Sequence, residues 1–303
     1  MFSRPRGIPL KSHSPNHAQP GTPASTVLLR DGPSGTDTLI EQIGPAGAGN
    51  TLVLLNGLLG QNRHWTQCVE HLAPQHRVVL LQPALLELTG PSCSVAGVVR
   101  IITEVLESVV GAPAVLAGNS LGGHVALRLA LERPHLIRGL VLIGSSGLFE
   151  RTLEKGVEHR PSREWMEKKI HGLFHDTASI PPTMVDEAYA EMCKRHSTRA
   201  LVKLGRSAKN DHLGEMLHGI TQPTLLAWGR NDLVTPPEVA EEFRSLIPGS
   251  KLEWIDRCGH APQIERPAEL AGLLSKFLGE LGATPADAKQ GRLSAGGRVK
   301  EVA

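Results

Sequence analysis

Short apolar runs rich in Val, Ile and Leu alternate with amphipathic stretches along most of this chain. Such runs, bounded by turn-forming residues, are typical of buried strands, whereas apolar positions spaced three and four apart are typical of helices. The pattern predicts strands at residues 26–29, 39–43, 51–55, 78–81, 114–117, 140–143, 224–226 and 252–255. It predicts helices at residues 65–73, 95–110, 121–132, 238–246 and 268–281. This alternation indicates an α/β domain with a mostly parallel central sheet, helices on both faces and an opening hairpin.

Residues 147–220 interrupt the alternation. They are charged and contain no convincing strand, and Pro161 and Pro181-Pro182 divide them into what we expect to be several short helices. A helical insertion after the sixth predicted strand would form a cap over the carboxyl ends of the strands. Such a cap would exclude water from a site beneath it.

The two ends of the chain lack the apolar periodicity of the rest. Residues 1–25 are rich in Pro, Ser and His, and they have no continuous apolar core of the kind that a secretory signal needs. Residues 282–303 are rich in Ala, Gly and charged residues. We expect both segments to be disordered tails around a core formed by residues 26–146 and 221–281.

A glycine-rich turn, residues 118–123 (GNSLGG), joins a predicted strand to a predicted helix. Small residues two before and two after a serine allow the flanking backbones to approach closely. A serine in such a turn exposes its hydroxyl at the start of a helix, where the helix dipole favours developing negative charge. Ser120 is therefore a candidate nucleophile, and the alternative is a glycine-rich turn without chemistry.

A serine nucleophile needs a base and an acid that orients the base. Asp232 lies just beyond the predicted strand at 224–226, and His260 lies in the loop after the predicted strand at 252–255. With Ser120, both candidates fall beyond the carboxyl ends of strands, where ligands bind in open α/β sheets. The chain order of serine, acid and histidine also suits this scaffold.

Four motifs in order give the chain a resemblance to the α/β-hydrolase superfamily, in its serine-nucleophile branch with a helical cap. They are residues 55–60 (LNGLLG), residues 118–123, residues 229–237 (GRNDLVTPP) and residues 258–267 (CGHAPQIERP). The resemblance covers about residues 26–281 and implies the α/β-hydrolase fold. Within the superfamily the chain is similar to carboxylesterases and to hydrolases of meta-cleavage products.

The resemblance implies a role for each matching residue. Ser120 would attack a carbonyl carbon, His260 would accept and return the proton, and Asp232 would orient the imidazole and stabilise its charged form. The backbone N–H groups of Leu58 and Leu121 would form the oxyanion hole. This machinery needs no cofactor and no metal.

The chain departs from the family pattern at positions that shape the substrate site. Position 56 is Asn where many relatives have His. It lies in residues 55–60, the loop that carries Leu58 and is called the oxyanion loop below, so the resemblance does not tell how this loop is hydrogen-bonded. Residues 82–88 (QPALLEL) stand where relatives often carry a loop rich in Asp, Gly and Ser, which predicts a more apolar rim. We expect substrate contacts from Asn56 and Trp65 beside this loop and from Phe174 and Met184 in the cap. The alternative for Trp65 is packing at the start of a helix, and for the cap residues it is burial against the main domain.

Other residues near these motifs offer weaker candidates. Cys258 lies two residues before His260, but it does not lie in a strand-to-helix turn like that of Ser120. Glu265 is expected to hold the His260 loop, with a role as a rival acid as the alternative. His171 and His175 are four residues apart, a spacing that can hold a metal, but no third ligand completes a pattern. We therefore predict no metal site.

Composition excludes several classes of protein. The chain has 303 residues, 40% of them hydrophobic, which suits one large α/β domain. Its 32 basic and 30 acidic residues leave a formal charge of +2, so no nucleic-acid partner is expected. No apolar run approaches the roughly 20 residues of a membrane span. Four cysteines without metal spacing favour reduced thiols and a cytoplasmic location. We expect a monomer or homodimer that acts on a small molecule.

The expected function is that of a serine hydrolase that cleaves a small, mostly apolar carboxylic ester through an acyl-enzyme. The serine argues against the dehalogenases and epoxide hydrolases of the superfamily, which use an aspartate nucleophile. One alternative is hydrolysis of a carbon–carbon bond in 2-hydroxy-6-oxo-dienoate (meta-cleavage) products, although such enzymes usually carry Trp where this chain has Ala261. A second alternative is a non-catalytic ligand-binding receptor on the same fold.

Overall fold

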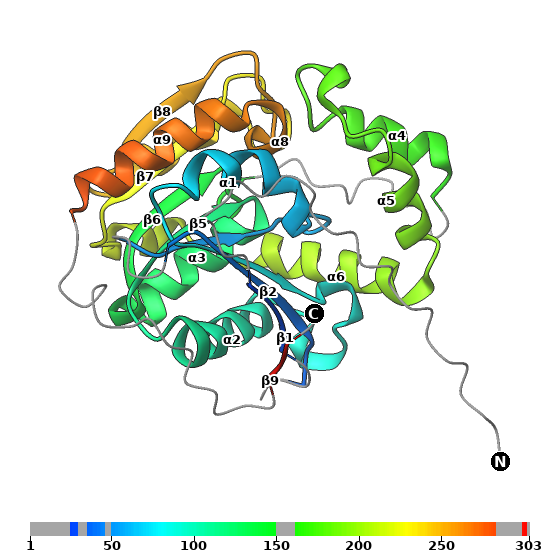
Figure 1. The fold of residues 1–303 in the computed structure, drawn as a ribbon. Helices are drawn as coiled ribbons and strands as arrows, with labels where there is room; N and C mark the ends of the chain where they lie inside the picture. The colour runs from blue at the N-terminus through cyan, green and yellow to red at the C-terminus, as the bar shows by residue number, and fades with distance from the viewer. Residues whose placement is uncertain (1–24, 30–34, 46–49, 150–160, 283–298, 302–303) are drawn as a thin grey trace.

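The computed structural model describes residues 25–29, 35–45, 50–149, 161–282 and 299–301. Its centre is one sheet, whose described strands are ordered β8-β7-β6-β5-β3-β4-β2-β1-β9 (Figure 1). These strands are β1 Ser25–Leu29, β2 Thr38–Ile43, β3 Leu52–Leu55, β4 Val78–Pro83, β5 Ala114–Asn119, β6 Ile137–Ile143, β7 Thr224–Gly229, β8 Lys251–Ile255 and β9 Val299–Glu301. The pairs from β4 through β3, β5, β6 and β7 to β8 are parallel, whereas β2 is antiparallel to β4 and β1. The predicted parallel sheet and opening hairpin are confirmed.

The predicted helices of the core are also present. The α-helices in the described ranges are α1 Thr66–Leu72, α2 Val95–Val105, α3 Leu121–Glu132, α4 Arg163–His171, α5 Met184–Met192, α6 Arg195–Asn210, α7 Pro237–Leu246, α8 Pro262–Glu265 and α9 Pro267–Glu280. α2 continues into a π-helical turn, Leu106–Val110, which ends where Gly111 adopts a left-handed conformation at φ 68°. Among the described residues, none of the helices has both the length and the apolar character needed to cross a membrane.

Alternate residues of the central strands pack on opposite faces of the sheet. Leu52 and Leu54 of β3 lie in one buried cluster with side chains of α1 and α9. Val53 and Leu55 lie in a second cluster with side chains of α2 and α3. All four are at most 3% exposed, as expected for a parallel strand covered by helices on both faces. The sheet therefore divides the core into two apolar layers.

The edge of the sheet beyond the hairpin differs from expectation. β9 pairs antiparallel with β1, so the prediction that residues 282–303 form only a disordered tail does not hold for residues 299–301. An edge strand is held by backbone hydrogen bonds on one side and needs no apolar periodicity, which is why the sequence pattern did not indicate it. The remainder of the two predicted tails, residues 1–24, 283–298 and 302–303, lies outside the described residues.

The described part of the segment between β6 and β7 is mostly helical. Its described part contains α4, α5 and α6, which lie to one side of the sheet (Figure 1). Met166 and Phe174 from this segment share an apolar cluster with Ala261 from the loop after β8. The insertion therefore packs on the part of the core that carries His260. Residues 150–160 lie outside the described residues.

Gly122 allows α3 to start directly against the loop after β3, and this close approach gives a prediction. A Cβ atom at Gly122 would overlap the carbonyl oxygen of Leu55, whereas a Cβ atom at Gly272 in α9 would meet no atom within 4 Å. We expect Gly122→Ala to lower the free energy of unfolding by about 1–3 kcal/mol, as overpacking does. We expect Gly272→Ala to raise it by about 0.5–1 kcal/mol. Urea denaturation of both variants tests this, and equal stability of the two would contradict it.

Candidate active site

The chain reverses direction at Ser120, between the end of β5 and the start of α3. Ser120 has φ 53° and ψ −118°, a conformation that non-glycine residues rarely adopt. Its N–H donates to the Ile143 carbonyl oxygen at 3.0 Å, and its own carbonyl oxygen accepts from Gly123 at 3.0 Å and Ser146 at 3.2 Å. A Cβ atom at Gly118 would overlap the backbone of Gly122. The predicted strand-to-helix turn is therefore present, and its glycines are needed for the close approach.

Asp232 lies in the turn after β7, with its side chain fully buried. Its Oδ1 atom accepts the backbone N–H groups of Val234 at 2.8 Å and Thr235 at 3.0 Å. Its Oδ2 atom accepts the Thr235 hydroxyl at 2.9 Å and lies 2.8 Å from Nδ1 of His260. A buried carboxylate needs such donors to remain charged. Four donors thus hold both oxygens of Asp232 in a fixed orientation.

His260 lies in the loop after β8, and its side chain is 7% exposed. A histidine that donates from Nδ1 to a carboxylate carries its lone pair on Nε2, so the pairing with Asp232 selects the tautomer that can act as a base at Nε2. The backbone of His260 is held on both sides: its N–H donates to the Leu173 carbonyl oxygen at 2.7 Å, and its carbonyl oxygen accepts from Nδ2 of Asn119 at 2.9 Å.

Two polar residues that the sequence analysis did not select connect these three segments. Asn119 precedes Ser120, and besides His260 it donates to the Ile143 carbonyl oxygen at 3.0 Å. Its Oδ1 atom accepts from Nε2 of Gln263 at 3.2 Å. Both side chains are buried. A polar residue within the apolar end of a strand was the available signal for Asn119, because a buried amide must find partners.

Gly144 is a second residue that sequence reasoning missed. It follows β6 with φ +49°, and a Cβ atom there would lie 2.9 Å from Oδ2 of Asp232 and 3.0 Å from Nδ1 of His260. Any side chain at this position would push the acid and the histidine apart. The absence of a side chain therefore lets β6 end directly beneath this pair.

The loop after β3 lies against the turn at Ser120. A Cβ atom at Gly57 would be 3.3 Å from Cβ of Ser120, so the backbone passes immediately beside that serine. The amide of Leu121 opens α3, where N–H groups lack intrahelical acceptors. In the described part of the chain, no backbone hydrogen bond of the loops and turns takes the amide of Leu58 or Leu121 as its donor. Both amides therefore remain candidates for an oxyanion hole.

The side chain of Asn56 holds the loop after β3 in place by hydrogen bonds. Its Oδ1 atom accepts from Nε1 of Trp65 at 2.9 Å, and its Nδ2 atom donates to Oδ1 of Asn62 at 3.1 Å and to the Leu81 carbonyl oxygen at 3.3 Å. These bonds answer the question that the replacement of His by Asn raised. Trp65 itself is fully buried in the core layer formed with α1. Its indole packs inward and supports Asn56, and its contact with a substrate stays a prediction.

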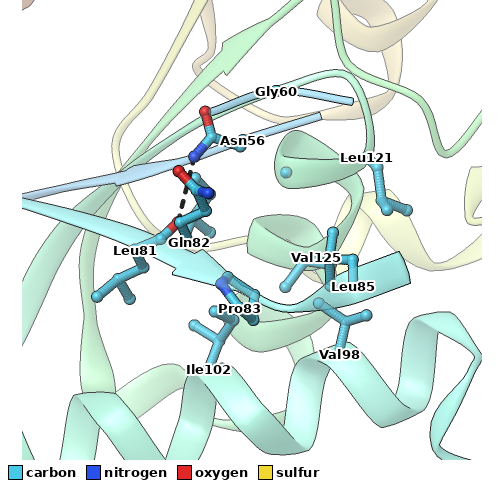
Figure 2. A pocket seen from close by; sticks show the side chains of 12 residues that line it. Asn56, Gly60, Leu81, Gln82, Pro83, Leu85, Val98, Ile102, Leu121 and Val125 are labelled. Carbon is cyan, nitrogen blue, oxygen red and sulfur yellow. Dashed lines mark hydrogen bonds between the residues drawn. The ribbon is translucent and has the colours of Figure 1, made fainter. Parts of the chain in front are cut away.

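A small cavity of about 20 Å³ lies next to this loop (Figure 2). Asn56 and Gln82 border it on one side, and apolar side chains including Leu85, Val98 and Leu121 border the rest. A volume of this size holds about one water molecule. Leu85 comes from the segment whose apolar character the sequence analysis predicted.

Phe174 and Met184, the expected contacts from the insertion, both belong to the apolar cluster that includes Ala261. Phe174 is buried, and Met184 is partly buried against the cluster. The side chain of Leu58 packs against the same cluster. These residues therefore lie between the insertion, the His260 loop and the oxyanion loop, and their contact with a substrate stays a prediction.

No group of three His, Cys, Asp or Glu side chains in the described ranges is arranged to hold a metal ion. His171 instead lies 3.9 Å from Glu167, one turn earlier on α4. The residues brought together at the strand ends have the chemistry of proton transfer and nucleophilic attack by a hydroxyl.

Comparison with known proteins shows what this chain is similar to. The model of the alpha/beta hydrolase family matches residues 52–273. The chain is 29% identical over 239 residues to the pimeloyl-[acyl-carrier protein] methyl ester esterase of Nitrosomonas europaea, covering 74% of this chain and 93% of that protein. It is 28% identical over 254 residues to the 2-hydroxy-6-oxo-2,4-heptadienoate hydrolase of Pseudomonas putida, covering 77% and 90%.

A solved structure shows the same relationship. The crystal structure of an alpha/beta hydrolase enzyme from a sediment metagenome of the Mar Chica lagoon, Morocco, superimposes with a TM-score of 0.65 at 29% identity, covering 84% of this chain and 98% of that one. Three further curated relatives are named as hydrolases of 2-hydroxy-6-oxo compounds. The matches to this chain cover 62%, 61% and 59% of their own lengths.

The cysteines give a prediction that separates Ser120 from a thiol nucleophile. Cys193 is exposed, whereas Cys68, Cys93 and Cys258 are buried. Burial raises the pKa of Cys68 to about 12, and burial together with the Glu265 carboxylate raises the pKa of Cys258 above its usual range. Because the thiolate is the reactive form, we expect Cys193 to react with a disulfide reagent at pH 8 far faster than the three buried thiols.

The matched control for this measurement is Cys193→Ser, which should remove the fast reaction and leave the slow ones. All four thiols should react after denaturation. Rapid modification of Cys258 in the native protein would contradict the assignment of that residue as an inert core thiol.

Proposed function

The chain belongs to the alpha/beta hydrolase family, and we propose that it is a serine hydrolase that cleaves a small, mostly apolar carboxylic ester. The observation that carries the proposal is the buried pair formed by Nδ1 of His260 and Oδ2 of Asp232 at 2.8 Å. Asn119, the residue before Ser120, donates to the His260 carbonyl oxygen at 2.9 Å, and Ser120 itself lies in a strained turn at the start of a helix. A receptor has no need of this combination, and the relatives reported above are named as enzymes.

In the proposed reaction, Oγ of Ser120 attacks the ester carbonyl carbon while Nε2 of His260 takes the hydroxyl proton. The carbon–oxygen bond to the leaving alcohol then breaks, and His260 returns the proton to that oxygen. Water attacks the resulting acyl-enzyme by the same route, and the acid and the starting serine are released. Asp232 holds the imidazole and stabilises its positive charge in both steps.

The negative charge on the carbonyl oxygen would be met by the amides of Leu58 and Leu121. The amide of Leu121 is the first N–H of the twelve-residue helix α3, so the helix dipole adds to its effect. Loss of one such donor typically costs about 3 kcal/mol in the barrier. We include both amides in the site because Gly57 places the Leu58 segment against Ser120.

The apolar cluster around Ala261 supports a substrate with little charge. Phe174, Met166 and Leu58 contribute to it. We propose that α4, α5 and α6 act as the cap and that Phe174 and Met184 line its inner side. The esterase relative from Nitrosomonas europaea is named for the hydrolysis of an ester, which is the reaction class proposed here.

Carbon–carbon hydrolysis is the second candidate, and the names of several relatives favour it. The same serine, histidine and aspartate could serve both reactions. A 2-hydroxy-6-oxo-dienoate carries a carboxylate, however, and burial of that charge requires a cation or several donors. The apolar cluster beside Ala261 suits an ester better than such an anion. We therefore keep ester hydrolysis as the main proposal.

The cysteines bear on the location of the protein. All four cysteines are free, as expected in a reducing compartment, and we place the enzyme in the cytoplasm on this ground. A monomer or a homodimer remains our proposal for its assembly.

Turnover of p-nitrophenyl esters from acetate to octanoate tests this function. We expect Ser120→Ala to lose at least about a thousandfold in kcat, since removal of a nucleophile leaves only the oxyanion hole and binding. Ser245→Ala is the matched control, because Ser245 is exposed on α7, and it should retain full activity. Ester turnover that survives in Ser120→Ala would contradict the proposal. Cleavage of a 2-hydroxy-6-oxo-dienoate faster than every ester would favour the second candidate.

A further inference from the structure

Glu265 ends the short helix α8 that follows the His260 loop, and it is 5% exposed. Its Oε2 atom accepts the backbone N–H of Gly259 at 2.7 Å and that of His175 at 3.3 Å. Its Oε1 atom accepts the backbone N–H of Asp176 at 2.6 Å. One buried carboxylate thus joins the loop of the candidate catalytic histidine to the segment that follows α4.

Backbone donors make this arrangement informative. A buried carboxylate is stabilised by charge-assisted hydrogen bonds, and these are short and directional. Because all three donors are main-chain amides, the bonds fix the path of the chain at Gly259, His175 and Asp176 rather than the rotamers of side chains. The two segments are far apart in sequence, so loop closure alone would not hold them together.

The adjacent contacts run between the same two segments. The N–H of His260 donates to the Leu173 carbonyl oxygen at 2.7 Å. A Cβ atom at Gly259 would overlap that same oxygen, so the two backbones are in direct contact. Ala261 continues the contact as part of the apolar cluster with Phe174. Residues 259–261 therefore lie along residues 173–176 by hydrogen bonds, close backbone approach and apolar packing.

We propose that Glu265 is a positioning residue that fixes the inserted helices to the His260 loop, so that placement of the imidazole depends on docking of the insertion. The proposal rests on the proposed role of His260 as the base. Glu265 acts through the amide of Gly259 and does not touch the reacting atoms. If the bonds of Glu265 are lost, residues 259 and 260 keep the hydrogen bond to Leu173 and the close backbone approach to the insertion, and Nε2 of His260 departs from its working position.

Glu265→Gln tests the proposal with almost no change of volume. It replaces one carboxylate oxygen with an NH2 group, which is a donor and cannot accept from a backbone N–H. Glu269→Gln is the matched control, since Glu269 is exposed in the first turn of α9. Three measurements are made on both variants: the rate at which Ser120 reacts with a fluorophosphonate, kcat and KM for a p-nitrophenyl ester, and hydrogen exchange of residues 172–177 and 257–261.

We expect the fluorophosphonate rate and kcat of Glu265→Gln to fall by about a hundredfold, because small misplacement of a catalytic group has effects of this size. KM should stay within about twofold. Exchange should increase at both segments together, and Glu269→Gln should match the wild type in every measurement. A role in stability alone would leave kcat and the fluorophosphonate rate of the folded variant unchanged, which would overturn the proposal. Increased exchange at only one of the two segments would overturn it too.

If Glu265→Gln does not fold, Glu265→Asp replaces it, because it keeps the carboxylate and shortens its reach. It should show the same effects to a smaller extent, and wild-type rates and exchange would overturn the proposal. Hydrogen exchange does not require turnover, so the link between the two segments is tested even if Ser120 proves not to be a nucleophile. Absence of fluorophosphonate labelling in the wild type would count against the proposed function, whereas unlinked exchange would count against Glu265.

Discussion

The reversal of the chain at Ser120 is the constraint on which the rest of the site depends. β5 ends at Asn119 and α3 begins at Leu121, so Ser120 alone lies between them, at a φ of 53°. A conformation of this kind costs about 1–3 kcal/mol and persists only where its surroundings determine it. Here the backbone of Ser120 makes four hydrogen bonds, to Ile143, Gly123, His124 and Ser146. The strained turn is therefore held by hydrogen bonds to the end of β6, to the residue that follows Ser145 and to the first turn of α3.

The segments that carry Ser120, Asp232 and His260 follow neighbouring parallel strands. β6, β7 and β8 end on the same side of the sheet as β5, so the loops that follow them meet there. Gly144 leaves space for Asp232 and His260, and Asn119 ties the His260 backbone to the strand that carries the serine. The insertion between β6 and β7 then covers the His260 loop and contacts it through Leu173. Main-chain contacts thus hold these loops and the insertion together more than contacts between side chains do.

The sequence predicted the sheet and the three candidate catalytic residues because both depend on local signals. Apolar runs indicated the strands, and glycine spacing indicated the turn at Ser120. The sequence left two positions open for Trp65 because it does not show which face of a short helical turn points inward, and in the structure its indole packs into the core. Asn119 owes its role to a partner far away in the sequence, which no local pattern reveals. The sequence did indicate that Glu265 holds the His260 loop, but not that it also binds His175 and Asp176 in the insertion. β9 was missed because an edge strand needs only backbone pairing.

The measurement that tests the central claim most directly is mass spectrometry of the protein quenched in acid during turnover of p-nitrophenyl acetate. The account predicts a mass increase of one acetyl group, located by proteolysis on the peptide that contains Ser120. Substitution of His260 by Ala should prevent its formation, because the serine would lose its base. An acetyl group found on another residue, or rapid turnover with no covalent intermediate on Ser120, would contradict the account.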